Sequence, residues 1–494
     1  MRPALLVVLV VWSCAAVLCA DEPVADQGFF QRAADRPWET PQRMPEPRYG
    51  MEGAERVAAV SATASRIPAE SADPIGAAST VAFPAPGPET PPAATGQDGE
   101  YYTLDELRTE MKKLAWTKGD FRIVPYGWLW GSAIYETERS FPGPYTLYVL
   151  SATDEGEHSF VIDTRRTRLG FDVAGPRIPM FGDAESGGKA EIDFHGAFVV
   201  ENKPGVLLRH AYGEIKNDQF RLLAGQTYDV ISPLYPGTLS YSVGWGGGNI
   251  GYRRAQVRLE RYFDLSDGCL LTVQGSGNQN IVSDFASTPG IRTESSAWPV
   301  IEGRVATTLG DRNPGGRPVT FGVSGHIGEQ GFDFLTPGPP PFSPPVENNA
   351  RRRTWSVNAD LYVPLTERFG VQAEFFTGEN LSTFLGGVIQ GVSPLTHETI
   401  RSTGGWFDVW YDWSPRLHSH AGYGLDDPLD ADVIQGRSYN QFIFANMVFD
   451  VTKNLNVGFE VSSWETLYID NRPGGVAPKP GESVGLEFTG KYGF

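Results

Sequence analysis

The last fourteen residues, 481–494, constrain the fold of this chain more than any other stretch. In an extended strand, one face carries Leu486 and Phe488 and ends in the aromatic rings of Tyr492 and Phe494, whereas the other face is small or charged. Such an apolar face is solvated by acyl chains in a bilayer, and aromatic rings collect at the membrane interface. The pattern therefore predicts the final strand of an outer-membrane β-barrel.

The first twenty residues predict export. Arg2 precedes an apolar run, 5–18, that is too short to span a bilayer, and Ala20 precedes an acidic and proline-containing stretch, as in a signal peptide covering 1–20. A lipid anchor at Cys19 is the less favoured alternative, because Leu18 stands where a lipoprotein site needs a small residue. After cleavage Cys269 is the one remaining cysteine, so no internal disulfide framework is expected.

Composition fits an exported barrel and argues against some other classes. The mean hydropathy is -0.26, yet aromatic residues make up 12% and glycine counts 57. A barrel gives this combination because only alternate residues face lipid. A formal net charge of -18 argues against nucleic acid as a partner and against binding to anionic membrane surfaces.

Two segments are expected before the barrel. Residues 21–100 are rich in Pro and Ala and predict a disordered periplasmic spacer, with peptidoglycan as a possible contact. Residues 101–118 predict a short helix with Thr103 as its N-cap. Its apolar positions, at heptad spacing, are Leu104, Leu107, Met111 and Leu114. Either local packing of one amphipathic face or a short coiled coil between protomers would explain them.

From 119 to 494 the chain alternates apolar and polar residues in segments of about ten residues. This pattern predicts an all-β fold, a transmembrane antiparallel up-and-down barrel of about 16 strands. The predicted strands begin near 121, 158, 188, 205, 219, 252, 267, 297, 317, 351, 369, 399, 416, 437, 455 and 481. Connectors after odd-numbered strands are long and those after even-numbered strands are mostly tight, except 175–187 and 202–204. Both termini are therefore expected on the periplasmic side of the outer membrane.

Several strands resemble those of a known family. Thr167–Val173, Lys189–His195, Leu208–Glu214 and Leu223–Tyr235 are similar to segments of the DcaP-type porins, and the phosphate-selective porins share parts of this pattern. The resemblance implies a trimeric outer-membrane channel for small organic anions. That family also carries an N-terminal coiled coil, whereas the helix predicted here is shorter and follows a long spacer.

The connector 228–251 is the predicted constriction loop. It is long, follows the fifth strand and contains a glycine-rich run, Gly244–Gly248, so its backbone can turn tightly inside a lumen. The alternative is an ordinary surface loop over the barrel mouth. The candidate constriction residues are Asp229, Pro233, Tyr235, Tyr241 and Trp245.

Arginines accumulate on the early strands at positions that alternate with the apolar face. The pore-lining candidates are Arg166, Arg168, Arg209, Arg221, Arg254, Arg258 and Arg304. Guanidinium groups bind carboxylate and phosphate, so a row of them would lower the barrier to anions. Acidic residues interleave with them, however, and salt bridges that brace the wall are the competing interpretation.

No catalytic constellation is apparent, no metal-ligand spacing occurs among the histidines, and no cofactor is expected. The sequence predicts a porin for passive diffusion of small hydrophilic solutes, with outer-membrane lipid as its surroundings. A non-conducting structural or adhesive barrel is the alternative.

Overall fold

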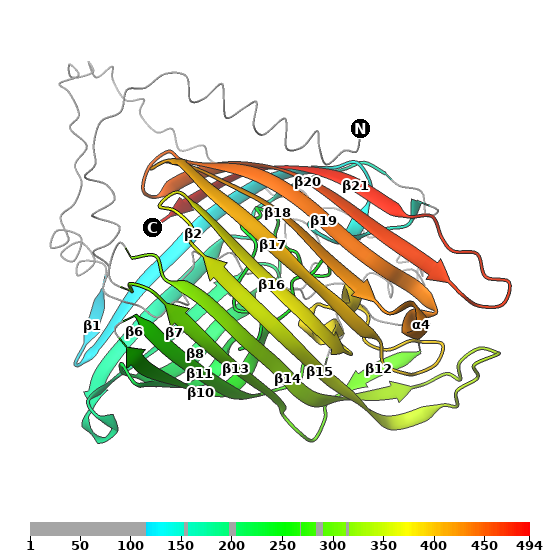
Figure 1. The fold of residues 1–494 in the computed structure, drawn as a ribbon, viewed down its shortest axis with the longest axis horizontal. Coiled ribbons are helices and arrows are strands. Elements are labelled where there is room, and N and C mark those ends of the chain that lie inside the picture. Colours follow the sequence, from blue (N-terminus) through cyan, green and yellow to red (C-terminus); the bar gives the residue numbers. More distant parts are fainter. Residues whose placement is uncertain (1–114, 153–156, 197–203, 267, 283–289, 313–315) are drawn as a thin grey trace, which may run out of the picture.

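The chain folds into one closed antiparallel β-barrel (Figure 1). The computed structural model describes residues 115–152, 157–196, 204–266, 268–282, 290–312 and 316–494. Within them the wall has sixteen strand positions, which confirms the predicted fold. The spacer and most of the predicted helix lie outside the described residues.

The wall strands follow one another around the barrel in chain order. They are β2 (Phe121–Glu136), β5 with β6 (Ser159–Asp163 and Arg168–Ile178), β7 (Ala184–Asp193), β8 (Leu207–Lys216), β9 (Phe220–Tyr228), β10 (Arg253–Ser266), β11 (Cys269–Asn278), β13 (Val300–Leu309), β14 (Val319–Phe334), β15 (Glu347–Val363), β16 (Phe369–Glu379), β17 (Arg401–Ser414), β18 (Leu417–Pro428), β19 (Gln435–Asp450), β20 (Leu455–Asp470) and β21 (Gly481–Gly493).

Pairing of β2 with β21 closes the barrel. Their register runs from Trp128 opposite Gly493 to Glu136 opposite Gly485. The Phe494 amide adds a hydrogen bond of 3.0 Å to the Gly127 carbonyl, so the C-terminus itself is held in the wall. Closure leaves no unpaired sheet edge, which is the condition for strands to cross a bilayer.

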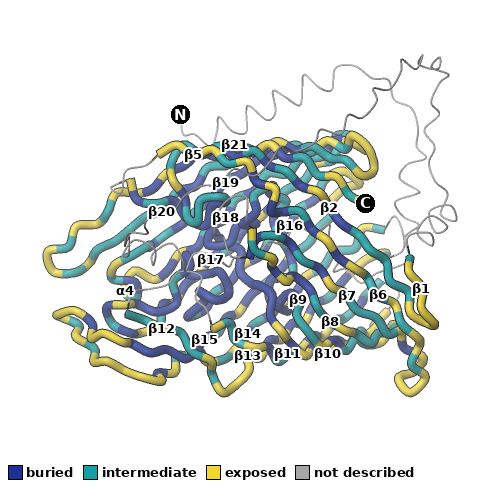
Figure 2. The backbone as a smooth tube through the Cα atoms, turned by 180° about the vertical axis from the view of Figure 1, so that it is seen from behind, coloured by how far each residue is buried: buried dark blue, intermediate teal, exposed yellow. Residues whose placement is uncertain are grey.

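Alternation along each strand separates a lipid face from an interior face. On β15, Val357 and Leu361 point outward and are exposed, whereas Ser356, Asn358 and Asp360, in the opposite phase of the strand, are buried. Exposed large apolar side chains recur at outward positions around the barrel, and buried residues concentrate in its middle (Figure 2). The apolar face is therefore on the outside, as in an outer-membrane barrel.

The two rims differ. The C-terminus and the short strand β1 (Trp116–Lys118) lie at one rim, and helix α4 (Asp430–Val433) and strand β12 (Ile291–Glu294) lie at the other (Figure 1). Turns at the first rim are tight, as at 451–454, and loops at the second are long. The connector 175–187 is longer than the other turns of the first rim, because β6 and β7 extend beyond the wall there and meet at the 3-10 turn η3 (Pro179–Phe181).

Two boundaries need correction. The segment Trp116–Lys118 is not the end of a helix but strand β1, which pairs with β2 at Phe121–Ile123, beyond the point where β21 ends. The third wall strand, β7, ends at Asp193 rather than beyond 200, so the connector that was expected at 202–204 spans 194–206. Its central residues, 197–203, lie outside the described part of the chain.

Three of the loops at the long-loop rim pack together inside the barrel. Loop 1 (137–158) contains the hairpin of β3 (Ser140–Pro142) and β4 (Thr146–Val149); loop 3 is 229–252; loop 6 (380–400) contains the turns η4 (Ser382–Phe384) and η5 (Gly387–Ile389). Among the described residues, no helix is long and apolar enough to cross a membrane.

Candidate functional site

Loop 3 lies inside the barrel and is hydrogen-bonded to the inner wall. Four of its backbone amides donate to carboxylates that project inward from four separate strands, at 2.5–2.9 Å. The donor and acceptor pairs are Val230 with Glu302 of β13, Leu234 with Glu374 of β16, Gly237 with Asp408 of β17, and Leu239 with Glu460 of β20. The loop thus runs along the wall as a belt and is held by charge-assisted hydrogen bonds.

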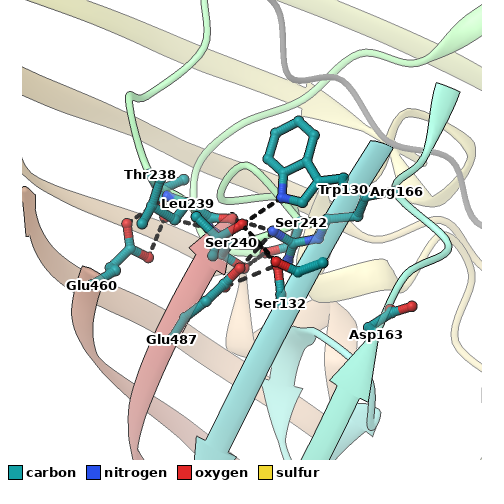
Figure 3. Close-up of polar contacts among 12 residues, drawn as sticks. Trp130, Ser132, Asp163, Arg166, Thr238, Leu239, Ser240, Ser242, Glu460 and Glu487 are labelled. Atoms are coloured by element: carbon teal, nitrogen blue, oxygen red, sulfur yellow. Dashed lines mark hydrogen bonds and ion pairs between the residues drawn. The ribbon is translucent and has the colours of Figure 1, made fainter. Parts of the chain in front are cut away.

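The far end of this belt is fixed at the seam of the barrel (Figure 3). Arg166 donates from Nη1 to the Leu239 carbonyl and to Glu487 Oε1, both at 2.6 Å. Glu460 accepts the Thr238 hydroxyl at 2.6 Å and the Leu239 amide at 2.5 Å. Both main-chain polar groups of Leu239 are therefore bonded to buried charged side chains; we call this arrangement the loop 3 anchor.

Loops 1, 3 and 6 pack together into an apolar cluster inside the long-loop half of the barrel, which we call the loop plug. It is composed of Tyr145, Leu147, Tyr148, Tyr241, Val243, Trp245, Tyr252, Leu385, Val388 and Ile389, with Trp130 of the wall. Main-chain bonds join its loops, since the Gly246 amide donates to the Leu385 carbonyl at 2.9 Å. From the wall, Asn440 of β19 donates to the Leu147 carbonyl at 2.7 Å and to the Gly246 carbonyl at 2.8 Å.

The plug contains strained backbone. Val243, Val388 and Ile389 have φ values of 43°, 46° and 60°, a region that β-branched residues rarely adopt. Each such residue costs about 1–3 kcal/mol, and strain of this kind gathers at functional sites. The packing of the three loops holds these residues in place.

The five candidate constriction residues divide into two groups. Tyr241 and Trp245 are fully buried in the loop plug, and Asp229 is buried at the start of loop 3, where it accepts the Tyr252 amide at 2.7 Å. Pro233 and Tyr235 are half-buried on the belt. Of the five, these last two keep part of their surface exposed.

Arg168 and Arg209 are buried beside a pair of carboxylates on β7. Arg209 donates to Glu191 at 2.6 Å and to Asp193 at 2.8 Å, and Arg168 Nη1 lies 3.9 Å from Glu191. Charges buried in this way persist because they are paired. Both guanidinium groups are therefore bonded to or adjacent to carboxylates of the wall.

Two further candidates are also buried in ion pairs. Arg254 is bonded to Asp229 of loop 3, and Arg304 donates to Asp360 at 2.6 Å across strands β13 to β15. The first pair ties the start of loop 3 to β10, and the second braces the wall. Neither guanidinium is at a solvated surface.

Arg221 differs from the other candidates in exposure. Arg258 is buried, with Nη1 3.4 Å from Glu260, whereas the Arg221 side chain keeps 16% exposure while it binds Glu214 at 2.6 Å and lies 3.5 Å from Glu260. Lys216, in register with Arg221 on β8, has 45% exposure. Arg221 and Lys216 are therefore partly exposed cations of the interior near the short-turn rim, on β9 and β8.

Outside the strands, His195 is one of the strongly perturbed titratable groups of the interior. His195 is buried with its ring centroid 3.6 Å from that of Tyr241. Burial, followed by the charges of Arg165, Arg166 and Arg209, holds its pKa well below the ordinary value. The neutral imidazole is therefore the form that fits under the plug.

Sequence reasoning did not find the carboxylates that hold loop 3, nor the part of loop 6 in the plug. Strand phase places Glu302, Glu374, Asp408 and Glu460 inside, but only the structure shows that their partners are main-chain amides. Among the described residues, no group of three or more His, Cys, Asp or Glu side chains could hold a metal ion.

A closed sixteen-stranded wall with an apolar outer face defines a barrel of the outer-membrane type, and loop 3 lies inside it. The solved structure of the outer-membrane channel DcaP of Acinetobacter baumannii is similar to this chain, with a TM-score of 0.58 and 18% identity, covering 76% of this chain and 99% of that one. At this identity the similarity shows a shared fold, and to that extent the resemblance seen in the sequence is confirmed.

More distant similarities are to an anion-selective porin from Comamonas acidovorans (TM-score 0.47, 11% identity, 76% and 100% coverage of the two chains) and to OprB of Pseudomonas putida (0.47, 11%, 78% and 96%). No model of a protein family matches the sequence, and no curated protein matches it either.

Proposed function

We propose that the protein is an outer-membrane porin that lets small hydrophilic solutes diffuse passively, with a preference for organic anions such as carboxylates or phosphate. The observation that carries the proposal is the internal loop 3, fixed to the inner wall of a barrel whose outer face is apolar. An internal loop narrows the aqueous column of a sixteen-stranded barrel and so gives it selectivity.

The distribution of charge supports the anion preference. Glu302, Glu374, Asp408 and Glu460 are buried against the amides of loop 3, so little of their charge faces water. Across the barrel, Arg221 and Lys216 keep part of their surface exposed. These two cations would then favour anions on the side of the barrel formed by β8 and β9.

Ion selectivity in planar bilayers tests the proposal. Reversal potentials across a KCl gradient should show anion preference for the wild type and a reduced preference for Arg221→Ala. The matched control is Arg416→Ala, which removes an exposed arginine from the turn before β18. Cation selectivity of the wild type would reject the anion preference, and absence of any conductance would reject the porin.

The loop plug favours a second candidate, a barrel that does not conduct in its resting state and has a structural or adhesive role. Loops 1, 3 and 6 form a continuous apolar cluster where an open channel would hold water. A variant with 382–391 replaced by a short glycine-rich linker distinguishes the two. If the variant conducts and the wild type does not, the plugged barrel is favoured. If the wild type and the variant both conduct, the porin is favoured.

The assembly and orientation belong to the same proposal. The long loops would face the exterior and both termini the periplasm, since tight turns line the periplasmic rim of such barrels. A homotrimer, and a contact of 21–100 with peptidoglycan, fit this orientation. Cross-linking in native membranes would test the first, and pull-down with purified peptidoglycan the second.

A further inference from the structure

We propose that the outer surface of β15 and β17 binds the phosphate-bearing headgroup of a lipid in the outer leaflet. The site is formed by Arg351, Arg353 and Arg401, which we call the arginine patch. This proposal goes beyond transport, and it rests on the proposed orientation of the barrel, with the long-loop rim toward the cell exterior.

The patch lies directly above the lipid face. On β15, Arg351 and Arg353 share the outward phase of Val357 and Leu361, and on β17 Arg401 shares that of Phe407. Side chains in one phase of a strand line one face, and residues two apart are about 6–7 Å apart along it. The arginines therefore follow the last apolar rows at the level where hydrocarbon gives way to headgroups.

Trp355 marks this level independently. It lies between Arg353 and Val357 in the same outward row, and its indole Nε1 donates to Glu379 at 2.7 Å. Tryptophan is enriched at the interface of a bilayer, because its ring prefers the apolar side and its N–H the polar side. In the strand register, Trp355 of β15 lies opposite Glu379 of β16, and Glu379 lies opposite Arg401 of β17. Arg401 is therefore near the level of Trp355.

In the ion pairs of the patch, the guanidinium groups are more exposed than the carboxylates. Arg353 binds Glu379 at 3.0 Å and Arg401 binds Asp432 at 2.8 Å. The side-chain exposures are 63% and 57% for the two arginines but only 15% and 16% for their carboxylate partners. The guanidinium groups thus supply most of the exposed surface of each ion pair.

Arg351 supplies a charge without an acidic partner. Its Nη1 donates to the Ser295 carbonyl at 3.2 Å, and no carboxylate of the described residues forms an ion pair with it. Glu329 is outward and exposed, but it stands opposite Arg353 rather than Arg351 in the β14–β15 register. The remaining donors of Arg351 are available to a phosphate.

The chemistry of the patch selects phosphate over other headgroups. Guanidinium binds phosphate through two parallel N–H···O bonds, and Arg353 and Arg401, two strand spacings apart (about 10 Å), can engage separate groups of one large headgroup. Further around the wall, the outward residues near the same rim are Asp427, Gln441 and Glu465, which include no cation. Binding is therefore expected on one side of the barrel only.

The test compares lipid A in its bisphosphorylated and dephosphorylated forms, added to the full-length protein in nanodiscs and measured by native mass spectrometry. The wild type should bind the phosphorylated form, and the triple variant Arg351→Ala, Arg353→Ala, Arg401→Ala should bind it about a hundredfold more weakly. The control removes the same charge at the opposite rim, through Arg317→Ala, Arg368→Ala and Arg416→Ala, and should bind as the wild type does.

Three outcomes would overturn the proposal: equal binding by the two triple variants, equal binding of both lipid A forms, or displacement of the lipid by inorganic phosphate alone. If the first triple variant lacks the heat-dependent gel shift of a folded barrel, Arg351→Ala alone carries the test, and it should weaken binding about fivefold. Conductance measured in bilayers without lipid A should be the same in all variants. A failed lipid site is thereby distinguished from a failed porin.

Discussion

Replacing Glu460 by alanine should release the end of loop 3 from the wall. The carboxylate accepts the Thr238 hydroxyl at 2.6 Å and the Leu239 amide at 2.5 Å, and both bonds are lost in Glu460→Ala. A hydrogen bond to a charged group contributes about 1.5–3 kcal/mol, so the two bonds together contribute about 3–6 kcal/mol. Water that enters the space would recover part of this.

A net loss of about 2–4 kcal/mol is therefore expected, which shifts the ratio of docked to undocked loop by about 30- to 700-fold. Hydrogen exchange of the amides in 237–242 measures this ratio directly, because an undocked loop loses its protection. Single-channel recordings should show added current noise, since the released segment can move in the lumen.

Two controls make the result specific. Glu460→Gln keeps one acceptor oxygen, so its hydrogen exchange in loop 3 should be faster than that of the wild type and slower than that of Glu460→Ala. Glu465→Gln, at an outward position on the same strand, should leave exchange in loop 3 unchanged. If exchange and conductance of Glu460→Ala both equal those of the wild type, the anchor does not hold the loop, and the reasoning from its hydrogen bonds is refuted.

Three further predictions follow from the interior. Arg221→Glu should shift the reversal potential toward cations by more than Arg221→Ala, and identical values for the two variants would exclude a charge effect. Acid should loosen the plug: because burial against Tyr241 lowers the folded-state pKa of His195, its contribution to stability is present above about pH 6.5 and is lost as the pH falls further. Protease cleavage within loop 3 should therefore rise below about pH 6.5 in the wild type and less steeply in His195→Gln. Gly248→Val should undock loop 3, because Gly248 has a φ of 118° and a Cβ there would lie 2.2 Å from the Gly405 carbonyl oxygen; unchanged exchange in this variant would contradict that.

The wall could be predicted because its determinant is local. A strand with one face in lipid and one in a polar interior must alternate at period two, and this pattern needs no knowledge of partners. The predicted starts at 121, 369, 455 and 481 coincide with those of β2, β16, β20 and β21. Errors occur where alternation stops, as at the end of β7.

The roles of the arginines could not be predicted in the same way. Arg209 lies at an irregularity where the β7–β8 register shifts between Glu191 and Ile192, so period two gives no phase for it. Arg166 is covered by Leu239, which lies 73 residues further along the chain. Whether an inward arginine lines a pore depends on loops from distant parts of the sequence that cover it. The phase of its own strand gives no information about those loops.

The contacts of loop 3 connect its anchoring to the electrostatics of the barrel interior. A loop without regular secondary structure brings main-chain amides into the interior, and each buried amide needs an acceptor. Here the acceptors are inward carboxylates, so the residues that fix the loop are also the residues whose negative charge would otherwise oppose anions. Removing one of them would weaken the loop and also take a negative charge from the wall, whereas releasing the loop by other means would expose that charge. Glu374→Ala and Gly248→Val should therefore both free loop 3. Ion selectivity should move toward anions in Glu374→Ala and toward cations in Gly248→Val. A shift of the same sign in both variants would show that the carboxylates that anchor the loop do not set the selectivity.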